Sequence, residues 1–219
     1  MPRRLDLPDS ASLANAGGDG RMYAPSAARN ANVIGELVAL HAPATGRVLE
    51  IASGTGEHSV HIATRLPGLI WQPSDIDPAR RISIDAHGAE AGLANLRPAI
   101  DLDATTAGWA AAHDGQDVIL VVNLLHLVSW NEAQILIKEA AAALAPGGVL
   151  ILYGPFMRAG ELTSDGDERF HHSLQAQDAE LGYKDDFDVI DALQEAWLDL
   201  VEVNEMPANN LSFVARRGA

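Results

Sequence analysis

The chain has 219 residues, 47% of them hydrophobic, which is enough to bury one full core and too little for two large domains. Thirty acidic residues against fifteen basic ones give a net charge of −15, which repels phosphate backbones and argues against nucleic acid as a partner. The absence of cysteine excludes disulfides and thiolate sites, and no apolar stretch reaches the length of a signal-peptide core or a membrane span. We therefore expect a single-domain cytoplasmic protein that binds neither nucleic acid nor membranes.

The first predicted elements are a polar leader, a helix and a short strand. Residues 1–20 mix Asp, Ser, Asn and Gly with few apolar positions, so we expect a mobile leader there and an ordered domain over 21–219. Apolar side chains recur at helical spacing over 27–40, and a β-branched run follows at 47–53.

The rest of the chain alternates between helical and extended patterns. We predict a short helix around Trp109, longer helices at 57–66, 78–91, 130–145 and 186–197, and strands at 69–75, 96–103, 117–123, 148–154, 198–206 and 209–217. Such alternation indicates a parallel sheet covered on both faces, and the tight turn P-A-N-N before the last strand permits only an antiparallel pair there. The predicted fold is α/β, with one Rossmann-like, doubly wound, seven-stranded sheet that is mostly parallel and has an antiparallel last strand. Residues 157–185 are too long and polar for an ordinary connection, so we expect an insertion or a lid.

The stretch EIASGTGEHSVHIA at 50–63 follows the first predicted strand of the sheet, where ligands of open parallel sheets bind. Gly54 and Gly56 let the backbone approach a ligand closely, but a dinucleotide fingerprint would have a third glycine where Ser59 stands. Glu50 would repel a pyrophosphate and favour a ligand with a positive charge or an amine, and S-adenosylmethionine has both. Ser53, at the end of the strand, belongs to the same predicted site.

Asp75 ends the next predicted strand, twenty-one residues after Gly54. A carboxylate at this position can accept two hydrogen bonds from a ribose diol. Asp77 is the rival for this role, and either residue can instead cap the helix that begins at Pro78.

Five motifs together resemble those of one family: E-I-A-S-G-T-G-E-H-S-V-H-I-A, W-Q-P-S-D, L-A-P-G-G, Y-G-P-F and M-P-A-N-N-L. These motifs are similar to those of the methyltransferase-like protein 26 family and its bacterial relatives, which have the class I S-adenosylmethionine-dependent methyltransferase fold. The resemblance extends from about residue 21 to residue 217. The resemblance implies a cofactor site but supplies no methyl acceptor. The implied cofactor-binding residues are Glu50, Gly54, Gly56, Asp75, Asp103 and Asn123.

Two of these implied roles have structural alternatives. Asp103 would lie near the adenine amine, yet IDLDATT offers two aspartates, and Asp101 or Asp103 can simply start the following helix. Asn123 can bind the cofactor or tie a loop through its side chain.

Histidines raise the question of metal binding and of acid–base chemistry. His58 and His61 have a spacing compatible with metal ligands, but no third ligand or H-E-x-x-H pattern accompanies them, so no metal is expected. His126 follows the predicted strand at 117–123, where a neutral imidazole can take a proton from an attacking hydroxyl or amine. Its alternative role is core packing against Trp130.

Segments from both ends of the chain are expected to close the pocket. Arg29 and Asn30, near the start of the first helix, are candidates for the cofactor, because an arginine there can clamp a carboxylate. The predicted substrate-binding residues are Tyr23, Tyr153, Phe156, Asn209 and Asn210. Both asparagines also suit a tight turn, since Asn tolerates left-handed backbone conformations.

The sequence thus predicts an S-adenosylmethionine-dependent methyltransferase that acts on a small-molecule acceptor by in-line methyl transfer. Two alternatives stay open, a catalytically silent protein that binds the cofactor or a partner and an NAD-dependent oxidoreductase. The sequence indicates no oligomeric state.

Overall fold

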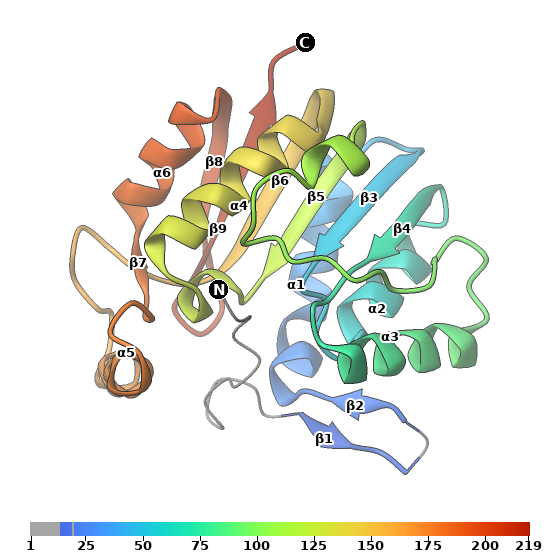
Figure 1. The fold of residues 1–219 in the computed structure, drawn as a ribbon, viewed down its shortest axis with the longest axis horizontal. Helices are drawn as coiled ribbons and strands as arrows, with labels where there is room; N and C mark the ends of the chain where they lie inside the picture. The colour runs from blue at the N-terminus through green and yellow to red at the C-terminus, as the bar shows by residue number, and fades with distance from the viewer. Residues whose placement is uncertain (1–13, 19) are drawn as a thin grey trace.

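The computed structural model of the chain describes residues 14–18 and 20–219, and its central feature is a sheet with helices on both faces (Figure 1). The strands are β1 (Asn15–Ala16), β2 (Met22–Tyr23), β3 (Gly46–Ile51), β4 (Leu69–Pro73), β5 (Gln116–Val122), β6 (Leu144–Met157), β7 (Lys184–Asp185), β8 (Leu198–Met206) and β9 (Asn210–Arg217). The helices are α1 (Pro25–His41), α2 (Glu57–Arg65), α3 (Pro78–Ala91), α4 (Trp130–Ala143), α5 (Asp165–Gln177) and α6 (Asp186–Glu195), with short 3₁₀ helices η1 (Ala110–Ala112) and η2 (Leu125–Leu127). Within the described residues, no helix combines the length and apolarity needed to cross a membrane.

The main sheet has the strand order β4-β3-β5-β6-β9-β8, with β7 paired to the end of β6. Strands β3, β4, β5 and β6 are mutually parallel. Strand β9 is antiparallel to both β6 and β8, so β8 runs in the same direction as β6. The predicted seven-stranded, mostly parallel sheet with an antiparallel last strand is confirmed.

One predicted strand, at 96–103, is wrong, and another segment supplies the seventh strand. Two isolated parallel bridges join this segment to β4, one of them between Ser74 and Ile100. Arg97 and Ile100 donate their N–H groups to the Trp71 and Pro73 carbonyls, so donors three residues apart meet acceptors two residues apart, and Pro73 has no N–H to return a bond. This mismatch interrupts a regular ladder. The seventh strand is instead the two-residue β7.

The central strands β5 and β6 contain near-continuous apolar runs, as expected where a sheet is buried on both faces, whereas β8 at the edge alternates polar and apolar residues. Neighbouring residues of a strand point to opposite faces, and β3 shows the result. Val48 packs in a core cluster with side chains of α1 and α2, whereas Leu49 packs in a second cluster with side chains of α4 and α6. With both faces covered, the carboxyl ends of β3, β4 and β5 remain open to a ligand.

The described part of the predicted leader forms a short hairpin. Residues 1–13 and 19 lie outside the described residues. Asn15 and Ala16 form β1, which pairs antiparallel with β2 just before α1.

The predicted insertion at 157–185 contains α5, a helix that the sequence analysis did not predict. Its start has recognisable signals, because the Ser164 side chain accepts a hydrogen bond from the Asp167 N–H at 3.2 Å and acidic residues occupy the first turn. Its apolar face is small, since His171 and Leu174 are its buried residues. The helix therefore lacks the apolar periodicity that reveals the other helices.

Candidate active site

A cavity of about 970 Å³ lies at the carboxyl ends of the parallel strands. Its lining comes from the segments after β3, β4, β5 and β6, from the start of α1 and from the turn between β8 and β9. Strand β3 has β4 on one side and β5 on the other. The strand order therefore reverses at β3, because the chain first adds β4 on one side and then returns to add β5 on the opposite side. Open parallel sheets bind ligands at such switch points.

Asp75 joins the loops after β3 and β4 in the wall of this cavity. Its Oδ2 accepts a hydrogen bond from the Gly54 N–H at 3.0 Å, and its Oδ1 accepts one from the Asp77 N–H at 2.9 Å. Burial raises the pKa of Asp75, and those two N–H groups and the nearby Arg80 act in the opposite direction. Each carboxylate oxygen keeps a lone pair for a further donor.

Asp77 takes the capping role that was open to both aspartates. Its Oδ1 accepts a hydrogen bond from the Ala79 N–H at 2.8 Å at the start of α3. Arg80, which the sequence analysis missed, also lines the cavity. Its guanidinium lies 3.3 Å from the position that a Cβ on Gly54 would occupy, so it borders the glycine turn.

Glu50 lines the cavity from the end of β3 but is 1% exposed. Its Oε2 accepts hydrogen bonds from the Ser59 hydroxyl and from Trp71 Nε1, the latter at 2.7 Å. Burial raises the pKa of Glu50 to about 7, although both donors oppose the rise. Ser59, which stands at the position of a third glycine, thus holds this carboxyl group in place.

The two predicted glycines have different positions. Gly54 lines the cavity and has a positive φ of 62°. Gly56 is outside the lining, and a Cβ added there would lie 2.7 Å from the Ile84 Cα. Gly56 therefore permits the close approach of α2 to α3. Ser53 lines the cavity and is buried, with its hydroxyl donating to the Glu50 carbonyl at 3.3 Å.

Asp103 and Asn123 also line the cavity, from the segments before and after β5. Asp103 Oδ1 accepts hydrogen bonds from the Thr105 N–H at 3.1 Å and from its hydroxyl at 2.6 Å. Asp101 is instead half exposed and pairs with Arg81 at 3.4 Å. Asn123 has a φ of 54°, and its N–H donates to the Tyr153 carbonyl in β6 at 2.8 Å, so the backbone fixes its position.

The start of α1 forms a further wall through Arg29 and Asn30, whereas Tyr23 lies outside the cavity against His87. Asn30 Oδ1 lies 2.8 Å from His58 Nε2. Burial lowers the pKa of His58 to about 4, so the ring is neutral and donates to Asn30. Among residues 14–18 and 20–219, no group of three or more His, Cys, Asp or Glu side chains is placed to hold a metal ion.

His126 lines the cavity from η2, immediately beyond β5. Its ring contacts Phe170 and Tyr183 edge-on, with centroids 5.7 Å and 6.2 Å away. Burial lowers the pKa of His126 to about 3, and the charge of Lys184 adds to this effect. The sequence analysis missed Phe170 and Tyr183, both of which line the cavity from the 157–185 segment.

The predicted substrate residues divide between cavity, core and surface. Tyr153 and Asn210 line the cavity. Phe156 is buried in the core against Phe213, with ring centroids 4.9 Å apart, and does not line the cavity. Asn209 lies on the turn between β8 and β9, also outside the lining, with the left-handed φ of 59° that its residue type tolerates.

A family model described as "Protein of unknown function (DUF938)" matches residues 21–217. The chain belongs to this family. The finer resemblance to the methyltransferase-like protein 26 family stays a prediction.

The fold of this DUF938 protein is similar to that of solved O-methyltransferases. An O-methyltransferase family protein from Burkholderia thailandensis is 19% identical with a TM-score of 0.76, and the alignment covers 89% of this chain and 57% of that one. A putative O-methyltransferase from Nostoc punctiforme is 18% identical with a TM-score of 0.77, and the alignment covers 88% of this chain and 57% of that one. Human N-acetylserotonin methyltransferase, solved in complex with S-adenosylmethionine, is 14% identical with a TM-score of 0.73, and the alignment covers 89% of this chain and 53% of that one. The chain thus spans little more than half the length of these proteins.

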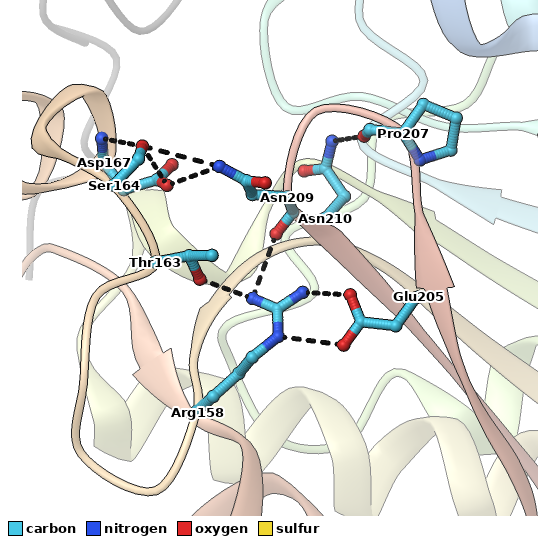
Figure 2. Close-up of polar contacts among 8 residues, drawn as sticks. All are labelled: Arg158, Thr163, Ser164, Asp167, Glu205, Pro207, Asn209 and Asn210. Atoms are coloured by element: carbon cyan, nitrogen blue, oxygen red, sulfur yellow. Dashed lines mark hydrogen bonds and ion pairs between the residues drawn. The ribbon is translucent and has the colours of Figure 1, made fainter.

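In this DUF938 protein, polar contacts fasten residues 157–185, which contain α5 and which we call the α5 segment, to the turn between β8 and β9 (Figure 2). Arg158 forms a two-pronged ion pair with Glu205, at 3.1 Å and 2.7 Å, and donates to the Thr163 hydroxyl at 2.7 Å. Asn209 Nδ2 donates to Asp167 Oδ2 at 3.0 Å. The Asp167 carboxylate also accepts the Tyr183 hydroxyl at 3.0 Å, so the same group holds a side chain of the cavity wall.

Proposed function

We propose that this protein is an S-adenosylmethionine-dependent methyltransferase that methylates a small molecule. The observation that carries the proposal is the hydrogen bond from the Gly54 N–H to Asp75. This bond holds the glycine turn after β3 against the carboxylate after β4, at the switch point of the sheet. The fold similarity to O-methyltransferases supports this function and favours an oxygen acceptor. The net charge of −15 disfavours nucleic acid as the substrate.

The residues of the cavity fit the groups of this cofactor. Asp75 has lone pairs left for a ribose diol, Asp103 would accept from the adenine amine, and Arg29 would pair with the methionine carboxylate. Glu50, Gly54 and Asn123, which line the same cavity, would help to hold the cofactor. S-adenosylmethionine, when bound, supplies a methyl group on a positively charged sulfur.

His126 is the proposed proton acceptor. Because burial lowers its pKa to about 3, the imidazole is neutral near pH 7 and can accept a hydrogen bond from an acceptor hydroxyl. The imidazole would take the hydroxyl proton as the acceptor oxygen takes the methyl group, and the electron pair of the broken carbon–sulfur bond would stay on the cofactor's sulfur. The same burial disfavours a lasting imidazolium, so the proton then returns to solvent.

Calorimetric titration with S-adenosylmethionine, S-adenosylhomocysteine and NAD tests the cofactor. We expect the first two to bind and NAD not to bind. Binding of NAD alone would replace the proposal with an oxidoreductase. An acceptor screen by mass spectrometry then tests turnover, and cofactor binding without any methylated product would favour the catalytically silent alternative.

The His126→Asn variant tests the role of the imidazole. Loss of a general base lowers turnover by about 10²-fold to 10⁴-fold, while cofactor affinity stays the same. His172→Asn, on an exposed position of α5, is the matched control and retains full turnover. Equal turnover in both variants would remove His126 from the mechanism.

A further inference from the structure

One end of the cavity differs in chemistry from the rest. The acidic lining residues Glu50, Asp75, Asp77 and Asp103 lie on the side of β3 and β4 or on the segment leading to β5, and Glu132 lines the cavity from the start of α4. On the other side, the segment after β5, strand β6, the α5 segment and the start of β9 supply a set of residues that we call the acceptor wall. The acceptor wall consists of His126, Tyr153, Phe170, Tyr183 and Asn210.

The acceptor wall contains no charged side chain. His126 is neutral near pH 7, because burial lowers its pKa. Lys184, whose charge acts on the His126 ring, is outside the cavity lining, and its ammonium donates to the Gly182 carbonyl at 3.0 Å. Asp167 is also outside the lining, and its carboxylate bonds to Tyr183. Glu132, the carboxylate that lines the cavity from α4, accepts the Ser129 N–H at 2.7 Å as part of a capping box. The five residues of the acceptor wall themselves offer no cation to a carboxylate or phosphate and no anion to an amine.

Three rings of the acceptor wall form a compact aromatic group. Phe170 and Tyr183 have centroids 6.0 Å apart, and each contacts the His126 ring edge-on. Aromatic rings prefer such edge contacts and offset stacking, so a planar ring is the partner that extends this arrangement best. The Asp167 bond to the Tyr183 hydroxyl fixes one of these rings.

The acceptor wall also holds polar atoms that need a partner. Among the described residues, three buried side-chain polar atoms lack a hydrogen bond, and two of them are His126 Nδ1 and the Tyr153 hydroxyl. The amides of Asn30 and Asn210 lie close enough to oppose the rise that burial causes in the Tyr153 pKa, but neither makes an aligned hydrogen bond to it. Leaving a buried polar group without a partner costs about 1 to 3 kcal/mol, so a ligand that supplies partners is favoured.

We propose that the methyl acceptor is an uncharged aromatic alcohol, held by the rings of Phe170 and Tyr183 and hydrogen-bonded by His126 and Tyr153. This inference rests on the proposed function. The hydroxyl of the acceptor donates to the imidazole, and a second polar group accepts from the Tyr153 hydroxyl.

Four probes that share one fused two-ring skeleton test this chemistry in the full chain saturated with S-adenosylhomocysteine. They are 2-naphthol, the 2-naphthoate anion, the 2-naphthylmethylammonium cation and the saturated alcohol decahydro-2-naphthol. Ligand-observed NMR titration measures each dissociation constant. We expect 2-naphthol to bind at least about 10-fold more tightly than each of the others, because only it meets both the aromatic and the neutral requirement.

The variant Phe170→Leu keeps apolar bulk and removes the ring, and we expect about a 10-fold loss of 2-naphthol affinity with S-adenosylhomocysteine affinity unchanged. Phe187→Leu, exposed on α6, is the matched control. If the anion or the cation binds as tightly as 2-naphthol, the acceptor need not be uncharged. If the saturated alcohol binds as tightly as 2-naphthol, the acceptor need not be aromatic. Either result would overturn the proposal. An equal loss of 2-naphthol affinity in Phe170→Leu and Phe187→Leu would also overturn the proposal. Failure of S-adenosylhomocysteine to bind at all would instead refute the proposed function.

Discussion

Replacement of Glu50 by Gln should stabilise the ligand-free protein at alkaline pH. Both donors to the Glu50 carboxyl, the Ser59 hydroxyl and Trp71 Nε1, bond to the same oxygen, Oε2. The single amide oxygen of Gln can accept both of them. The substitution therefore keeps these hydrogen bonds and removes the ionisation.

The magnitude follows from the pKa of Glu50, which burial raises from 4.5 to about 7. Between these pH values the folded protein retains a proton that the unfolded chain has lost, so the free energy of unfolding falls as pH rises through this window. At about 1.4 kcal/mol for each pH unit, the loss above pH 7 reaches about 3 kcal/mol. About 2 kcal/mol of it falls between pH 5.5 and 8.5.

Urea unfolding of both proteins at pH 5.5 and pH 8.5 measures this effect, and the lower limit stays above the isoelectric point of about 4.7. Burying the amide N–H₂ costs about 1 kcal/mol, but this cost is the same at both pH values. The stability of Glu50→Gln relative to the parent should thus rise by about 2 kcal/mol from pH 5.5 to 8.5. Glu36→Gln, whose side chain is 67% exposed, is the control and should show no such rise.

A relative stability that is the same at both pH values would refute this reasoning, because it would mean that Glu50 ionises normally in the folded protein. The cofactor provides a second measurement. If Glu50 favours the sulfonium, the parent should prefer S-adenosylmethionine over S-adenosylhomocysteine more strongly at pH 8 than at pH 6. The Gln variant should show a preference that is independent of pH.

Two further predictions concern the cavity wall and its closure. Asp75→Ala should weaken S-adenosylhomocysteine binding at least about 10-fold and lower the free energy of unfolding by about 2 kcal/mol, because the Gly54 and Asp77 N–H groups lose their acceptor. Asp77→Ala, which removes a helix cap and a 3.8 Å ion pair with Arg80, should cost about 1 kcal/mol and leave affinity unchanged. Equal affinity losses for the two variants in calorimetry would contradict these assignments. Arg158→Ala should speed hydrogen exchange in α5 with little change in melting temperature, because exposed ion pairs add little global stability. The control Arg65→Ala, on α2, should leave exchange in α5 unchanged, and unchanged exchange in Arg158→Ala itself would show that the contacts of Figure 2 do not fasten the segment.

Strands buried on both faces could be predicted from the sequence, because burial on both faces demands an unbroken apolar run. The predicted strand at 117–123 differs from β5 by one residue at each end. The segment 96–103 carries part of such a pattern, but its donors to β4, Arg97 and Ile100, are three residues apart, so it forms isolated bridges and no regular ladder. Helix α5 escaped prediction for the opposite reason, since its small buried face leaves little periodicity to detect.

The candidate site could be predicted where position along a strand determines position in space. Glu50, Asp75 and Asp103 follow strands or strand-like segments, so parallel pairing alone brings them to one edge. Phe170 and Tyr183 reach the same cavity only because the α5 segment folds back over it. No spacing in the sequence encodes that return, which depends on side-chain contacts such as those in Figure 2.

Glu50 links the stability of the fold to the proposed function. Its backbone carbonyl accepts the Ser74 N–H at 2.9 Å and the Ser74 hydroxyl at 2.8 Å, so β4 fixes its position whether or not its side chain is charged. Its carboxylate is costly without a ligand, since burial opposes the charge. A positively charged ligand beside Glu50 would stabilise its carboxylate and lower its pKa. Binding would therefore restore the free energy of unfolding that ionisation of Glu50 removes from the ligand-free protein. The sequence therefore keeps at this position a group that weakens the empty fold, as binding sites commonly do.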